Sequence, residues 1–151
     1  MPIKIIIGSD HGGYNLKKAI ITHLKQHSIE AEDMGTTNAD DSVDYPDFAV
    51  LVAKKVQADE NTHGILICGT GIGMSISANK FKGIRAALCH NEVTAKMARE
   101  HNDANILVLG GRVLTIEYAL IIVNKWLETP FSNEERHLRR LEKIKQIEEC
   151  N

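Results

Sequence analysis

The chain has 151 residues, of which 43% are apolar and 25% are charged, and its formal net charge is −2. This length and composition are typical of one folded domain rather than of a disordered segment, so we expect residues 1–151 to form a single domain. The near-balanced charge excludes a general basic surface for nucleic acid, and no apolar run reaches the length of a membrane span.

The first strand-like segment, Ile3–Gly8, is too short for the apolar region of a signal peptide, so we expect a cytoplasmic protein. The three cysteines, Cys68, Cys89 and Cys150, are far apart and form no CxxC pair. This spacing predicts free thiols rather than a zinc site or a disulfide framework.

Five short apolar runs alternate with glycine-containing turns and longer amphipathic stretches, as βα units do. The predicted strands are 4–8, 29–34, 64–68, 84–89 and 105–109, and the predicted helices are 14–27, 46–58, 73–80, 91–100, 115–127 and 133–149. Most of these strands are continuously apolar, which is typical of parallel strands covered on both faces. We therefore predict a doubly wound α/β sheet of five mainly parallel strands flanked by helices, with a C-terminal helix and the polar second strand near an edge.

Polar residues and glycines gather directly after the predicted strands, where ligands bind in open parallel sheets. Cys68 ends one strand, and Gly69-Thr70-Gly71-Ile72-Gly73 then opens a helix. Backbone N–H groups at such a turn can bind an anion or a developing oxyanion, and a helix N-terminus favours the thiolate of cysteine. Two structural interpretations stay open, because any tight turn favours glycine and a strand-end cysteine can simply be a small core residue.

Two further pairs could handle protons or grip hydroxyl groups. Asp10-His11 follows the first strand, on the same rim as Cys68, although Asp10 is equally suited to cap a helix. His101-Asn102 closes a predicted helix, where a plain C-cap is the alternative. Asp10 and His11 alone give too few ligands for a metal, so we expect none.

Arginines could supply the local positive charge that a phosphate needs. Arg112 follows two glycines on the rim, and Arg136 and Arg140 lie four residues apart, on one face of the last helix. A solvated basic face is the alternative for that helix. Its other side carries Leu138, Leu141 and Ile144, which we expect to be buried.

Six segments carry a resemblance to a known family: Gly8–Gly13, Asp44–Pro46, Gly64–Ser75, Ala78–Lys80, Gly83–Ala86 and His101–Asn105. In this order they resemble ribose-5-phosphate isomerase type B and its galactose-6-phosphate isomerase relatives, over nearly the whole chain. The resemblance implies a Rossmann-like fold, a reaction without metal or cofactor, and homodimers or tetramers with active sites between subunits. The implied activity interconverts D-ribose 5-phosphate and D-ribulose 5-phosphate through a cis-enediolate, a step of the pentose phosphate pathway.

The resemblance also implies roles for individual residues. Cys68 would move the proton between C2 and C1, the amides of Gly69–Gly73 would stabilise the enediolate oxygen, and Thr70 would assist proton movement between the oxygens. His101 would promote opening of the furanose ring, while Asp10 and Asn102 would hold sugar hydroxyls. The implied phosphate ligands are His11, Arg112, Arg136 and Arg140. Some relatives use a glutamate base in the helix after the glycine loop; this chain has Ser75 there, which favours the cysteine.

Two alternatives to ribose 5-phosphate isomerisation stay open. The same machinery could isomerise allose 6-phosphate or galactose 6-phosphate. A non-catalytic nucleotide-binding module could use the same frame, but the G-x-G-x-x-G spacing is absent. Since one chain carries all the implied catalytic residues, a self-sufficient homo-oligomer is favoured over two unlike subunits.

Overall fold

A computed structural model describes residues 2–151 and contains one five-stranded sheet. The strands are β1 (Lys4–Ser9), β2 (Ala31–Asp33), β3 (Thr62–Cys68), β4 (Ala86–Leu88) and β5 (Ile106–Gly110). They run in the order β2-β1-β3-β5-β4, and every neighbouring pair is parallel. The predicted sheet is confirmed, including the position of β2 at an edge.

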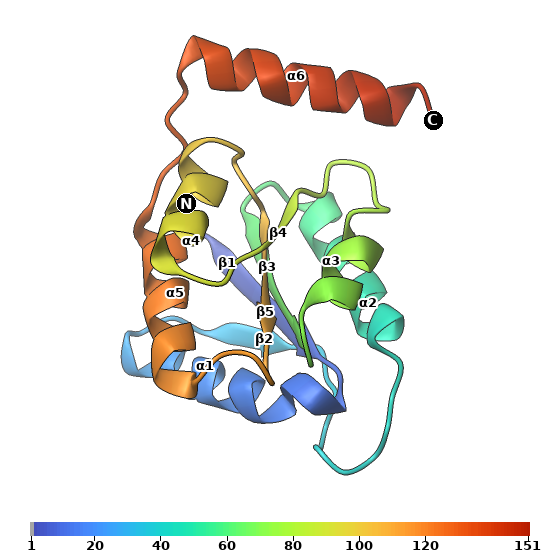
Figure 1. The fold of residues 1–151 in the computed structure, drawn as a ribbon, viewed down its shortest axis with the longest axis vertical. Coiled ribbons are helices and arrows are strands. Elements are labelled where there is room, and N and C mark those ends of the chain that lie inside the picture. The colour runs from blue at the N-terminus through green and yellow to red at the C-terminus, as the bar shows by residue number, and fades with distance from the viewer. Residues whose placement is uncertain (1) are drawn as a thin grey trace.

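Six α-helices and one short 3₁₀ turn connect the strands. The helices are α1 (Tyr14–Gln26), α2 (Tyr45–Ala58), α3 (Ile72–Ala78), α4 (Glu92–Glu100), α5 (Ile116–Glu128) and α6 (Glu135–Glu149), and the 3₁₀ turn is η1 (His11–Gly13). Helices α1, α4 and α5 cover one face of the sheet, and α2 and α3 cover the other (Figure 1). This is the doubly wound arrangement that the apolar strands predict.

The two faces of the sheet bury alternating residues of the same strands. On one face Ile65 and Leu107 belong to the cluster that includes Trp126 of α5, and on the other Leu66 and Val108 pack with Val52 of α2. Because helices cover both faces of the sheet, the central strands are continuously apolar in sequence. The edge strands β2 and β4 are three residues each, shorter than predicted, because each pairs with one neighbour only.

The strand order reverses between β1 and β3. The chain passes from β1 to β2 on one side and then crosses back to β3 on the other side. Such a reversal opens a crevice at the carboxyl ends of the two strands. Here η1 lies against β3, since a Cβ atom at Gly13 would stand 2.6 Å from the carbonyl oxygen of Ile67. The residues after β1 and those after β3 are thereby brought together.

Helix α6 differs from expectation. It lies across the end of the sheet where the strands begin and projects from the body of the protein (Figure 1). Leu138 and Ile144 are 49% and 39% exposed, and Leu141 is half-buried. The prediction that these residues are buried is therefore wrong for the single chain. His137 is the buried residue of this helix, because its ring turns back onto the end of α4.

Among residues 2–151, no helix is both long enough and apolar enough to span a bilayer.

Candidate active site

Cys68 is the last residue of β3 and sits at the crevice where the strand order reverses. Its side chain is 4% exposed, and its sulfur accepts a hydrogen bond from the N–H of Gly71 at 3.2 Å. An N–H group that points at sulfur stabilises negative charge on it. Gly71 can make this contact because the chain turns there with a φ of +82°, which favours glycine.

The glycine loop makes two further contacts. Ile72 donates its N–H to the hydroxyl oxygen of Thr70 at 3.2 Å, so the hydroxyl hydrogen of Thr70 is left to point towards a ligand. Close packing also explains Gly73, where a side chain would collide with the ring of Tyr45. Tyr45 is the first residue of α2 and packs against Gly73, a contact that the sequence did not predict although the Asp44–Pro46 motif contains this tyrosine.

Asp10 and His11 face this loop from the end of β1. Asp10 is 7% exposed and accepts a hydrogen bond from Gly13 N–H at 3.1 Å, so it caps η1 and retains a second carboxylate oxygen for a ligand. The Nδ1 atom of His11 accepts the N–H of Val43 at 3.2 Å, which places the hydrogen of a neutral ring on Nε2. The cap interpretation and the rim position of Asp10 are therefore both correct.

Arg112 completes this first group of residues. Its N–H donates to the carbonyl oxygen of Gly69 at 2.9 Å, and its guanidinium lies next to the backbone of Gly12 and Gly69. The side chain is otherwise exposed. A positive charge therefore stands over the loop that follows Cys68, where an anionic substrate would enter.

A second group of predicted residues lies at the opposite end of the sheet. His101 and Asn102 follow α4 and precede β5, whereas Cys68 pairs with Gly110 at the far end of β5. The four residue steps from Ile106 to Gly110 alone separate the two ends by about 13 Å. Arg136 and Arg140 belong to this second group, because α6 lies at the end where the strands begin (Figure 1).

His137 links α6 to the second group and was not singled out from the sequence. Its ring stacks on that of His101, with 4.2 Å between centroids. Arg136 Nε donates to His137 Nε2 at 3.3 Å, so the ring hydrogen is on Nδ1, which donates to Ser132 Oγ at 2.6 Å. Burial, helped by the nearby His101, lowers the pKa of His137, so the ring stays neutral beside Arg136.

Neither group of site residues includes the other two cysteines, His23 or His27. Cys89 is 1% exposed and burial raises the pKa of its thiol to about 11, while Cys150 is exposed, so all three cysteines are free as predicted. His23 of α1 and His27, the C-cap of that helix, form an HxxxH pair whose rings lie 4.5 Å apart. Among residues 2–151, no three His, Cys, Asp or Glu side chains come close enough together to hold a metal ion.

Comparison with known proteins identifies the family. The sequence model of the family described as Ribose/Galactose Isomerase matches residues 5–144. The chain belongs to this family. It is 51% identical to a putative sugar phosphate isomerase of Bacillus subtilis, over 99% of each chain. It is 45% identical to ribose-5-phosphate isomerase B of Escherichia coli, over 97% of each chain.

Solved structures of family members have the same fold as this one. Ribose-5-phosphate isomerase B of Clostridium thermocellum shares 54% identity and a TM-score of 0.94, with 98% of this chain and 99% of that chain covered. The Mycoplasma genitalium enzyme, solved with bound ribulose 5-phosphate, shares 45% identity and a TM-score of 0.95, with 100% of this chain and 99% of that chain covered. The family resemblance expected from the motifs is thus confirmed.

Proposed function

We propose that this chain is an aldose–ketose isomerase that interconverts D-ribose 5-phosphate and D-ribulose 5-phosphate. The observation that carries the proposal is the sulfur of Cys68, held by the Gly71 amide at the crevice between β1 and β3. A base buried beside backbone donors suits removal of a proton next to a carbonyl group, because the charge that leaves carbon moves onto oxygen. Membership of the ribose/galactose isomerase family gives the substrate class.

The proposed reaction uses Cys68 as the only base. Its thiolate removes the proton from C2 of the open-chain aldehyde, and the electron pair moves through the C1–C2 bond to the C1 oxygen, giving a cis-enediolate. Thr70, whose hydroxyl hydrogen is free, assists transfer of the proton on the C2 oxygen to the C1 oxygen. The Cys68 thiol then returns its proton to C1, leaving the ketone at C2. N–H groups of the Gly69–Gly73 loop stabilise the negative oxygen.

The Gly71 amide requires a correction to the expected oxyanion site. The family resemblance implies that every amide from Gly69 to Gly73 stabilises the enediolate oxygen, but the Gly71 N–H donates to Cys68 Sγ and the Ile72 N–H to Thr70 Oγ1. These two amides hold the catalytic side chains because the left-handed turn at Gly71 aims the chain back at the sulfur. We therefore propose that the amides of Gly69, Thr70 and Gly73 stabilise the enediolate oxygen.

The remaining assignments concern the two ends of the substrate. Asp10, with one carboxylate oxygen free, holds sugar hydroxyls together with Asn102, and His101 promotes ring opening. Phosphate is bound by His11 through its Nε2–H, by Arg112, and by Arg136 and Arg140. Those four donors come from both groups of site residues.

We further propose that two copies of the chain share each active site. His101, Asn102, Arg136 and Arg140 lie at the opposite end of the sheet from Cys68, and a five-carbon sugar phosphate is too short to reach both groups within one chain. The exposed apolar face of α6, with Leu138 and Ile144, supplies the surface that a second copy would cover. A homodimer with a two-fold axis builds two such sites at once. Tetramer formation and the cytoplasmic location stay predictions.

A direct assay with purified protein tests the substrate. Ribose 5-phosphate should be converted far faster than allose 6-phosphate or galactose 6-phosphate. Cys68→Ala should lower kcat by at least ~10³-fold while substrate still binds, because the glycine loop stays intact. Cys150→Ala is the matched control and should behave as wild type. Substantial turnover by Cys68→Ala would contradict the base assignment.

Complementation tests whether the site is shared. Cys68→Ala and His101→Ala should each be nearly inactive as homodimers. When the two variants are unfolded and refolded together, each mixed dimer contains one site with both residues intact, so the mixture should regain about a quarter of wild-type activity. No recovery, with mixed dimers demonstrated by native mass spectrometry, would place both residues in the site of one chain.

A further inference from the structure

The turn between α4 and β5 carries two of the proposed site residues on an unusual backbone. His101 is the C-cap of α4, Asn102 is exposed, and Asp103 has a φ of +44°. A non-glycine residue in the left-handed region costs free energy, so the surrounding contacts must hold it there. What fixes this turn therefore fixes the direction of the His101 and Asn102 side chains.

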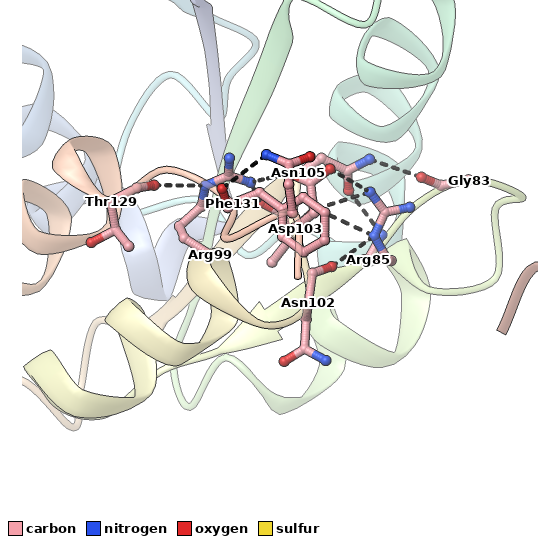
Figure 2. Close-up of polar contacts among 10 residues, drawn as sticks. Gly83, Arg85, Arg99, Asn102, Asp103, Asn105, Thr129 and Phe131 are labelled. Atoms are coloured by element: carbon pink, nitrogen blue, oxygen red, sulfur yellow. Dashed lines mark hydrogen bonds and ion pairs between the residues drawn. The ribbon is translucent and has the colours of Figure 1, made fainter. Parts of the chain in front are cut away.

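Arg85, the residue before β4, donates hydrogen bonds to two consecutive carbonyl groups of the turn (Figure 2). Its Nε donates to the carbonyl oxygens of Asn102 at 2.9 Å and Asp103 at 3.2 Å, and its Nη2 donates to Asp103 O at 2.9 Å. The same Nη2 lies 3.6 Å from a carboxylate oxygen of Asp103. A planar guanidinium can make these contacts together, whereas an ammonium group cannot reproduce them.

The backbone of Arg85 is fixed as firmly as its side chain. Its N–H donates to Asn105 Oδ1 at 2.8 Å, and its carbonyl oxygen accepts from Asn105 N–H at 3.1 Å. Asn105 in turn donates to the carbonyl oxygen of Gly83 at 2.8 Å. Arg85 thus links the chain before β4 to the turn through both its backbone and its side chain (Figure 2).

Arg99 supports the turn from its inner side. It is 8% exposed and donates to Ala104 O at 2.6 Å and Asp103 Oδ1 at 2.9 Å. Its guanidinium also lies 5.6 Å from the ring of Trp126 in the core. Because Arg99 is part of the core packing, its loss would destabilise the whole domain, and Arg85 is the residue whose effect can be separated from folding.

We infer that Arg85 is a positioning residue for catalysis, which acts by orienting His101 and Asn102 towards the substrate. The inference rests on the proposed function, in which those two side chains act on the sugar. The guanidinium of Arg85 already donates hydrogen bonds to two carbonyl groups and pairs with Asp103. The residue therefore acts through the turn and not through contact with substrate. A displacement of about 1 Å at a reacting group can lower a rate by about 100-fold.

The test compares two substitutions of Arg85 with a control on the same loop. Arg85→Met and Arg85→Lys should each lower kcat/KM for ribose 5-phosphate by about 10- to 100-fold, because neither side chain can hold both carbonyl groups. Lys82→Met removes an exposed cation three residues earlier and should stay within twofold of wild type. Thermal unfolding of every variant identifies losses of activity that are caused by misfolding. If Arg85→Met does not fold, the result for Arg85→Lys alone tests the inference.

A double-mutant cycle separates positioning from a general structural effect. In a His101→Ala, Asn102→Ala background, Arg85→Lys should lower kcat/KM by less than about threefold, since the side chains it orients are gone. Equal losses in both backgrounds would overturn the inference, as would full activity of Arg85→Lys in the otherwise wild-type chain. If the wild-type chain does not isomerise ribose 5-phosphate, the proposed function fails first, and that result is distinct from either outcome.

Discussion

The backbone N–H of Gly71 donates a hydrogen bond to the sulfur of Cys68 at 3.2 Å. The contact joins the side chain of Cys68 to the left-handed turn of the glycine loop. This donor would stabilise negative charge on the sulfur. The geometry leaves no room for another residue, because a Cβ atom at position 71 would lie 2.5 Å from Leu88 Cδ1 and 3.1 Å from the Leu109 carbonyl group.

Gly71→Ala should therefore impair both stability and catalysis. We expect the free energy of unfolding to fall by at least ~2 kcal/mol, from backbone strain plus the collision, and kcat to fall about 100-fold. Urea unfolding and steady-state kinetics measure the two effects. Gly83→Ala is the matched control, since its φ of +78° is similar but no atom lies within 4 Å of the added Cβ. It should lose about 1 kcal/mol and keep its kcat.

The three thiols should react with iodoacetamide in a fixed order. Exposed Cys150 should be modified first, without loss of activity, and Cys89 should stay unmodified in the folded protein because it is buried with its pKa raised to about 11. Modification of Cys68 should abolish activity, and ribose 5-phosphate should slow it. Mass spectrometry of peptides taken during inactivation gives the order, and inactivation that tracks Cys150 would contradict it.

The arginines of α6 should differ in their effects. Arg136→Ala and Arg140→Ala should each raise KM by about 10-fold with little change in kcat. The reason is that binding of the phosphate stabilises the ground state and the transition state equally. Arg139→Ala removes the same charge from a position about 100° around the helix from Arg140 and should have little effect on either constant. A loss confined to kcat in the first two variants would argue against phosphate binding.

Lys17 is fully buried and holds the segment that follows β2. Its Nζ donates to Asp33 Oδ1 at 2.6 Å and to the carbonyl oxygen of Thr36 at 2.5 Å. That segment leads to Val43, which hydrogen-bonds His11. Lys17→Met should lower the free energy of unfolding by about 1–3 kcal/mol and raise KM. The exposed neighbour Lys18, changed to Met, should alter neither quantity; equal effects of the two substitutions would exclude a specific role for Lys17.

His63 should make the protein sensitive to acid. Burial, followed by the positive charge of Arg99, lowers the pKa of this histidine from 6.5 to about 4. On acidification the unfolded chain binds the proton before the folded chain does, so the free energy of unfolding falls as the pH drops from about 7 to about 4. After allowance for partial exposure, the contribution is about 1–2 kcal/mol.

His63→Gln removes this titration and retains a polar side chain. The stability of the variant relative to wild type should therefore rise steadily as the pH is lowered through this window. Urea unfolding of both proteins at several pH values measures the difference. A constant difference between them would show that the pKa of His63 is the same in the folded and the unfolded chain.

Much of the fold follows from local sequence patterns. Apolar runs such as Ile65–Ile67 and Leu107–Leu109 are buried on both sides, and such runs mark central parallel strands. The residues after them, including Cys68 and Asp10, were expected on one rim because the carboxyl ends of parallel strands meet at the same edge. The residues at the ends of the edge strands β2 and β4 could not be predicted from local sequence, because the length of an edge strand depends on how far it pairs with its neighbour.

The sequence by itself determined the sheet, its helices and the first group of site residues, because periodicity and strand-end signals are local. Tertiary structure decided that β3 lies beside β1, that His101 and Arg136 lie at the opposite end of the sheet from Cys68, and that the apolar side of α6 is exposed. It also revealed His137, which stacks on a ring 36 residues away along the chain, and Arg85, which binds carbonyl groups at least 17 residues away. Contacts of that separation depend on the packing of whole elements, which no local pattern records.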